Sequence, residues 1–115
     1  MAITREAFVS LVKNAVANDV SDIHIRQDEK PSFRMRGDLV SVKMDPLTDE
    51  DMRIIMKIIV KDEEIHELLA KNKLKEYDGS FAVPNVCRVR INFMKYQGKM
   101  GLILRIISDK IPTTE

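Results

Sequence analysis

The chain has 115 residues, and a hydrophobic content of 44% is enough for one packed domain that needs no disulfide or metal to fold. Its 19 basic and 18 acidic residues leave a net charge of +1, and only 5% of its residues are aromatic, so we expect no nucleic-acid partner. No apolar run approaches the roughly 18 residues of a membrane span, and the first residues lack a signal-peptide pattern, so we expect neither membrane insertion nor export.

The residue types that support catalysis or metal binding are sparse. One cysteine and two histidines exclude an intramolecular disulfide and provide no set of metal ligands. Cys87 stands in a run of alternating apolar residues, which favours an inert core thiol in a reducing compartment. His66 lies among glutamates and is predicted to be solvated on a helix surface. There is no glycine-rich phosphate loop and no nucleophile elbow, so no catalytic residue is expected in this chain.

The first predicted elements are one helix and two strands. A helix over 5–18 is expected because apolar side chains recur at the spacing that lines one helical face. After this helix the period changes to two residues, first at Ile23 and Ile25 and then at Phe33 and Met35. This alternation predicts two half-buried strands.

A hairpin is predicted to follow the second strand. Gly37 and Asp38 have the glycine-first chemistry of a two-residue hairpin turn. Such a turn would place Met35 opposite Val40 and start a third strand over 39–43.

The second predicted helix begins after its N-cap, Thr48, and runs to about Val60. The usual apolar stripe consists of Met52, Ile55, Met56 and Ile59. Ile54 and Ile58 widen this stripe to roughly half of the circumference. A short third helix around Ile65 is one candidate to cover the wide face. The alternative is that Ile54 and Ile58 dock another domain or subunit.

The remaining residues are strand-like, with predicted strands over 77–83, 87–95 and 100–107 and turns at 84–85 and 97–98. The last turn brings the apolar residues of its two strands together on one face, and a slip of one residue would break this match.

The same register places Arg90 opposite Arg105 on the other face, with Arg88 one step along the strand. Like charges that face each other cost up to about 1 kcal/mol, so this arrangement favours an anionic ligand between them. Two alternatives stay open: the arginines extend into water, or an acidic residue from another strand neutralises them. Arg34 and Arg36 either extend the basic patch or form a solvated edge.

His24 is the remaining candidate for chemistry, as a general base beside Asp22. The two residues lie on the face opposite Ile23 and Ile25, and a hydrogen-bonded structural role for His24 is the favoured interpretation.

Several short motifs resemble those of the type IV pilus and type II secretion motor ATPases. The segment Ser21-Asp22-Ile23-His24-Ile25 resembles the signature of that family. Other matches follow in order, at family spacing: Pro31, Arg34, Gly37-Asp38-Leu39, Glu76, Asp78, Ser80-Phe81, Val83-Pro84, Arg88-Val89-Arg90-Ile91-Asn92, Gly98 and Arg105-Ile106. The resemblance covers nearly the whole chain.

This resemblance implies a fold and a domain organisation. It implies an α+β domain over 1–108, with a PAS-like antiparallel sheet and helices packed on one face. Residues 109–115 would then begin a linker to a RecA-like catalytic domain that this sequence lacks. The start at the first helix is similar to the retraction motors of twitching motility.

The resemblance also implies a function in a larger motor. In this family the catalytic domain binds ATP and Mg²⁺, and the motor works as a homo-hexamer in the cytoplasm, peripheral at the inner membrane, on pilus or secretion platform proteins. The amino-terminal domain closes over the nucleotide. The residues implied to reach the phosphates are Arg88, Arg90 and Arg105. The residues implied to be structural members of the family signature are Ser21, Asp22, His24, Arg34 and Gly37. A stand-alone PAS-like sensor or protein-interaction module is the alternative function.

Overall fold

The computed structural model describes residues 3–83 and 87–108. The elements in chain order are α1 (Arg5–Ala17), β1 (Asp22–Arg26), β2 (Ser32–Met35), β3 (Asp38–Ser41), α2 (Asp49–Ile59), α3 (Glu63–Ala70), β4 (Glu76–Val83), β5 (Cys87–Tyr96) and β6 (Lys99–Ser108). The predicted turn at 84–85 and the predicted linker at 109–115 lie outside the described residues.

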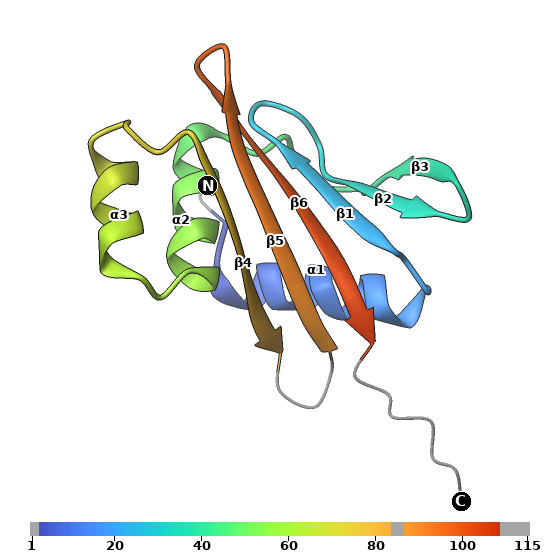
Figure 1. Cartoon of the computed structure of the whole chain (residues 1–115). Helices are drawn as coiled ribbons and strands as arrows, with labels where there is room; N and C mark the ends of the chain where they lie inside the picture. Colours follow the sequence, from blue (N-terminus) through green and yellow to red (C-terminus); the bar gives the residue numbers. More distant parts are fainter. Residues whose placement is uncertain (1–2, 84–86, 109–115) are drawn as a thin grey trace, which may run out of the picture.

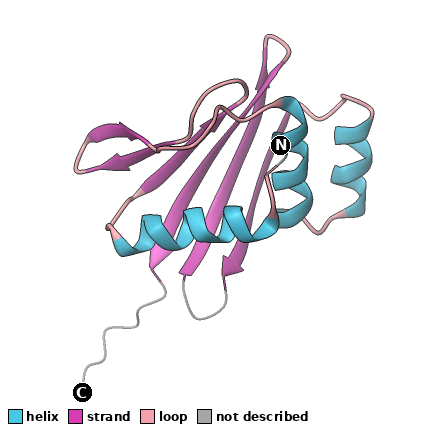
Figure 2. Ribbon diagram, turned by 180° about the vertical axis from the view of Figure 1, so that it is seen from behind, coloured by secondary structure: helices cyan, strands magenta, loops and turns pink. Residues whose placement is uncertain are grey.

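The strands form one sheet in the order β3-β2-β1-β6-β5-β4, and each strand is antiparallel to its neighbours. The helices pack on one face of this sheet, with α1 running across the strands (Figures 1 and 2). The expected α+β class, with an antiparallel sheet covered on one side, is confirmed. The first and last thirds of the chain meet in the middle of the sheet, where β1 pairs with β6.

Local hydrogen bonds explain where the first two helices begin. The Thr4 hydroxyl accepts the amide N–H of Ala7 at 3.1 Å and caps α1. In α2 the Thr48 hydroxyl accepts the amide of Asp51, and the Asp51 carboxylate accepts the amide of Thr48, which is a capping box. Asp51 also accepts the amide of Ile3 at 2.7 Å, so one buried carboxylate joins the start of the chain to α2.

The wide apolar face of α2 is partly covered by α3. Arg53 joins the two helices, since its guanidinium donates to the carbonyl of Leu69 and to the side chain of Asn72. Ile54 and Ile58 are both half-buried, and Ile58 packs against the core.

The predicted β2–β3 turn is wrong by one residue. Its central residues are Arg36 and Gly37, with φ of 52° and 88°, so that Phe33 faces Val40 and Met35 faces Asp38. Positive φ at both central positions is the geometry of a type I′ turn, which needs glycine at the second position rather than the first.

The predicted β5–β6 register is confirmed. The turn consists of Gln97 and Gly98, with φ of 50° and 82°, and it pairs Tyr96 with Lys99. Every pair along the two strands follows from this turn, including Arg90 opposite Arg105.

His66 differs from its prediction as a solvated side chain. Its Nε2 lies 2.6 Å from the carbonyl oxygen of Val60, at the end of α2. Its Nδ1 is buried and has no hydrogen-bond partner in the described part of the chain. The reason is that α3 turns this face of the helix toward α2 rather than toward water.

Candidate functional site: the open face of the sheet

The sheet face opposite the helices carries the polar side chains of alternate strand residues. No helix in the described ranges covers this open face (Figure 1). In β5, for example, the odd-numbered residues from Cys87 to Phe93 are buried, whereas Arg88, Arg90 and Asn92 are exposed. The period of two along each strand therefore separates an apolar core face from a polar outer face.

One cross-strand row of the open face brings together four of the residues that the sequence singled out. We call it the arginine row; its members in order across the sheet are Arg34, Asp22, Arg105, Arg90 and Ser80. Each member is paired directly with the next. Three of the five carry a positive charge, and these come from β2, β6 and β5.

An ion pair at the centre of the row reduces the repulsion between the arginines. The Nε of Arg105 donates to Oδ1 of Asp22 at 3.3 Å, and the Ser21 hydroxyl donates to Oδ2 at 3.2 Å. The Arg105 side chain is 69% exposed and that of Asp22 only 10%. The acidic neighbour that the sequence left open as an alternative is therefore present for Arg105.

Arg90 differs from Arg105 in this respect. Among the described residues, Arg90 makes no ion pair, and it is exposed beside Arg105. Only the Nε of Arg105 donates a hydrogen bond to a described residue, so the terminal N–H groups of its guanidinium, which has five N–H donors in all, have no partner there. An anion at this place would find donors from both arginines.

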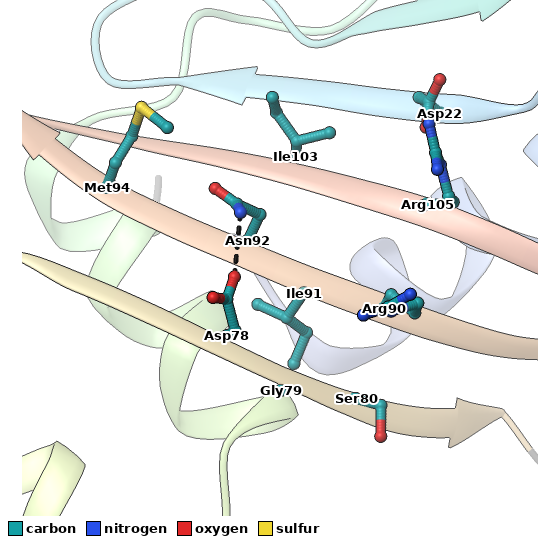
Figure 3. Close-up of a pocket in the computed structure, with 10 residues that line it drawn as sticks. All are labelled: Asp22, Asp78, Gly79, Ser80, Arg90, Ile91, Asn92, Met94, Ile103 and Arg105. Carbon is teal, nitrogen blue, oxygen red and sulfur yellow. Dashed lines mark hydrogen bonds and ion pairs between the residues drawn. The ribbon is translucent and has the colours of Figure 1, made fainter.

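A shallow hollow of about 700 Å³ lies over the members of the arginine row other than Arg34. Its polar lining includes Asp22, Arg105, Arg90 and Ser80, and further along the strands it reaches Ile103 (Figure 3). On the neighbouring row the side-chain amide of Asn92 donates to the carboxylate of Asp78 at 2.9 Å. The hollow thus combines arginines at one end with an amide–carboxylate pair and apolar side chains at the other.

Three residues of the predicted basic patch lie outside this hollow, and Arg34, at the end of the arginine row, is one of them. Arg88 is exposed one row further along β5, opposite Ile107, and does not line the hollow. Arg36 stands in the β2–β3 turn together with Gly37, so it does not extend the row.

His24 lies on the open face, one row from Asp22, between Ser32 and Ile103. Partial burial lowers its pKa below 6.5, and the nearby charges of Arg34 and Arg26 lower it further, whereas Asp22 acts to raise it. The Asp22 carboxylate accepts from Ser21 and Arg105, and no hydrogen bond joins it to His24 within the described part of the chain.

The sequence alone did not predict that Asp22 is the counter-ion of Arg105. Its position within the strand was predicted, but its proximity to Arg105 depends on the pairing of β1 with β6, which are distant in the chain. No local turn specifies that pairing.

Within residues 3–83 and 87–108, no group of three or more histidine, cysteine or acidic side chains is placed to hold a metal ion. No helix in those ranges is both long and apolar enough to cross a membrane.

Solved structures with the same fold define the class. A crystal structure of the pilus retraction motor PilT with bound ADP matches 90% of this chain and 30% of its own, with a TM-score of 0.74 and 27% identity. The X-ray structure of the Legionella pneumophila ATPase DotB matches 93% of this chain and 30% of its own, with a TM-score of 0.74 and 21% identity, which is evidence of a common fold. The fold of the chain is similar to that of the amino-terminal domain of PilT.

The most informative sequence relative is a retraction motor. The chain is 28% identical over 95 residues to the type IV pilus retraction ATPase PilT of Pseudomonas aeruginosa, covering 83% of this chain. It spans 27% of the length of that relative. No family model matches the chain. These matches confirm the resemblance seen in the motifs and do not favour the alternative of a stand-alone sensor.

Proposed function

We propose that this chain is the nucleotide-gating and ring-assembly domain of a type IV pilus motor, of the retraction type, or of a secretion ATPase. In this proposal the open face closes over ATP and Mg²⁺ held by a RecA-like domain. Arg90 and Arg105, with Arg88 beside them, contact the phosphates. The assembled motor is a homo-hexamer in the cytoplasm, at the inner membrane, on pilus or secretion platform proteins.

The observation that supports this proposal most is the exposed arginine row. Arg105 pairs with Asp22, whereas Arg90, which faces it, has no ion-pair partner among the described residues, so the two arginines retain unpaired N–H donors and an excess of positive charge. Phosphate oxygens are suitable acceptors for such a pair, because each guanidinium donates to two oxygens at once. The relative with bound ADP is a protein of the same fold.

In this proposal the chain by itself does not hydrolyse ATP. A row of arginines stabilises phosphate charge, but hydrolysis also needs a loop of backbone N–H donors, a Mg²⁺ site and an oriented water. The sequence contains no phosphate-binding loop. The catalytic groups are therefore assigned to the RecA-like domain.

The test begins with the chain itself and inorganic pyrophosphate as the probe. In a titration at low salt followed by amide chemical shifts, we expect weak binding with the largest changes around Arg90 and Arg105. Arg90→Ala should abolish these changes. Arg26→Ala, a charge deletion two rows away on the same face, is the matched control and should retain them.

The second part of the test uses the complete hexameric motor. Arg90→Ala should reduce ATP turnover by about 10³-fold, the lower end of what arginines contribute to phosphoryl transfer. Normal turnover together with a lowered melting temperature would show that these arginines only hold the fold together.

A further inference from the structure

The outer edge of β4 has unpaired backbone groups. β4 is the last strand of the sheet, and no other described segment pairs with its outer side (Figure 1). The amide of Lys95 donates to the carbonyl of Lys75, so this facing pair is hydrogen-bonded. Because hydrogen-bonded and non-hydrogen-bonded pairs alternate in antiparallel sheets, the backbone groups of Asp78, Ser80 and Ala82 point outward.

Half of this edge lacks the usual protection against pairing with another strand. Natural edge strands are protected by charges, prolines or bulges. In β4 the charged residues are Glu76 and Asp78, at its beginning, and its register with β5 runs without a bulge. The stretch from Gly79 to Val83 has neither a charge nor a proline.

A groove lies beside the unprotected half. It has a volume of about 620 Å³ and is bounded by β4, the start of α1 and the end of α2. Half-buried apolar side chains line it, namely Val9, Ile58, Tyr77 and Phe81. Ile58 is one of the two residues whose position in the sequence indicated docking.

The rim of the groove carries positive charge without partners. Arg5 and Lys61 are exposed at the rim, and neither forms an ion pair with another described residue. Asp62 also lines the groove, but its carboxylate accepts the amide of Glu64 as the N-cap of α3. A carboxylate from outside would therefore complement the rim.

We propose that this surface binds an extended peptide segment of another protein by strand addition to β4. The peptide backbone pairs with the outward groups of Ser80 and Ala82, and alternate apolar side chains enter the groove against Phe81 and Ile58. A peptide carboxylate pairs with Arg5 or Lys61. This surface shares Ser80 with the arginine row but includes none of the arginines of that row, so the inference does not depend on the nucleotide-gating function.

The test uses a synthetic peptide of eight residues in which valine alternates with threonine, followed by two glutamates. Added to the 115-residue chain, this peptide should shift the amides of residues 79–83 and slow hydrogen exchange at Ser80 and Ala82. The same peptide methylated on alternate backbone nitrogens should not bind, because it cannot donate hydrogen bonds to the edge.

Two variants test backbone pairing and charge separately. Ser80→Pro removes an outward N–H that β5 does not use, and it should weaken peptide binding by about tenfold or more. Lys61→Glu should weaken binding of this peptide and strengthen binding of a peptide that ends in two lysines. Lys57→Glu, a reversal on α2 away from the groove, should change neither.

Three results would overturn the proposal. One is that Lys61→Glu and Lys57→Glu have equal affinities for each of the two peptides. Another is a set of amide shifts confined to the three arginines of the arginine row. The third is strong protection of the Ser80 amide in the free chain with sedimentation as a dimer, which would mean that a second copy occupies the edge. None of these results affects the pyrophosphate experiment.

Discussion

The Nε of Arg105 lies 3.3 Å from Oδ1 of Asp22, and on its other side Arg105 faces Arg90. The Asp22 carboxylate is nearly buried, and its hydrogen bonds come from an exposed arginine and from Ser21. One carboxylate therefore orients Arg105 and offsets part of the repulsion from Arg90. The two arginines differ in environment although they face each other in one pair.

This difference predicts opposite effects of two alanine substitutions on stability. Arg105→Ala removes the partner of a nearly buried carboxylate and should lower the free energy of unfolding by about 1 kcal/mol, a modest value because the arginine itself is exposed. Arg90→Ala removes a like charge and should be neutral or stabilising by up to about 1 kcal/mol. Urea unfolding of both variants of the chain measures the two values. Equal destabilisation by both substitutions would mean that the Asp22 ion pair is not specific to Arg105.

Removing the negative charge of Asp22, the counter-ion of Arg105, should strengthen anion binding. Asp22→Asn keeps an oxygen that accepts from Arg105 but removes a negative charge beside the proposed phosphate site. Pyrophosphate affinity should rise roughly threefold to tenfold, as expected for a partly screened charge at this range. The measurement is the same titration at two salt concentrations, and the gain should shrink at high salt. Unchanged affinity at low salt would place the anion away from the arginine row.

The hydrogen bonds to Asp51 predict that the folded chain loses stability in acid. Burial acts to raise its pKa, but hydrogen bonds from the amides of Thr48 and Ile3 and from the Thr48 hydroxyl outweigh burial and lower the pKa below 3.8. A carboxyl group whose pKa is lower in the folded chain than in the unfolded chain stabilises the fold at pH values above its unfolded pKa. This stabilisation is lost as the pH falls through its folded pKa. Asp51→Ala should cost about 0.5 to 2 kcal/mol at neutral pH, as for the loss of a cap. Below pH 3.8 the difference from the unmodified chain should diminish, as measured by urea unfolding at both pH values.

Part of the site could be predicted because two local signals agreed. The turn at Gln97 and Gly98 and the apolar alternation of β5 and β6 specify the same register, so the facing arginines follow from the sequence. At the β2–β3 hairpin, Gly37 suits a two-residue turn at either central position, and the hydrophobic pattern did not decide between them. The partner of Arg105 depends on the pairing of β1 with β6, for which no short loop gives a register.

The half-buried isoleucines of α2 predict unequal effects of lysine substitution. Ile58 packs against the core and lines the groove, whereas Ile54 does neither. Ile54→Lys should therefore leave the circular dichroism spectrum unchanged and cost less than about 1 kcal/mol, while Ile58→Lys should cost more because it removes buried apolar surface. In the complete motor, both should impair ring assembly if this face docks another subunit. Assembly of Ile54→Lys at the normal level would remove Ile54 from that interface.

The final prediction concerns Gly79 and the ring of Tyr77, which lies over it. A Cβ atom placed at Gly79 would come within 2.5 Å of the Tyr77 hydroxyl oxygen and 2.7 Å of a ring carbon. Glycine in a strand interior normally weakens the strand, but here the aromatic ring of the same strand occupies the space that a side chain would fill. Gly79→Ala should therefore destabilise the chain, because the ring must move away from its position against the core.

A double-mutant cycle separates this contact from the general preference of strands for alanine over glycine. In the Tyr77→Ala background, Gly79→Ala meets no ring and should be stabilising by about 0.5 to 1 kcal/mol, the usual gain from restricting the unfolded chain. In the unmodified chain, the same substitution should have the opposite sign. The coupling free energy from four urea unfolding curves would then be about 1 kcal/mol or more, within the range known for residues in contact. Additive effects, with Gly79→Ala equally favourable in both backgrounds, would show that the ring leaves this position without cost and that the glycine is not required for it.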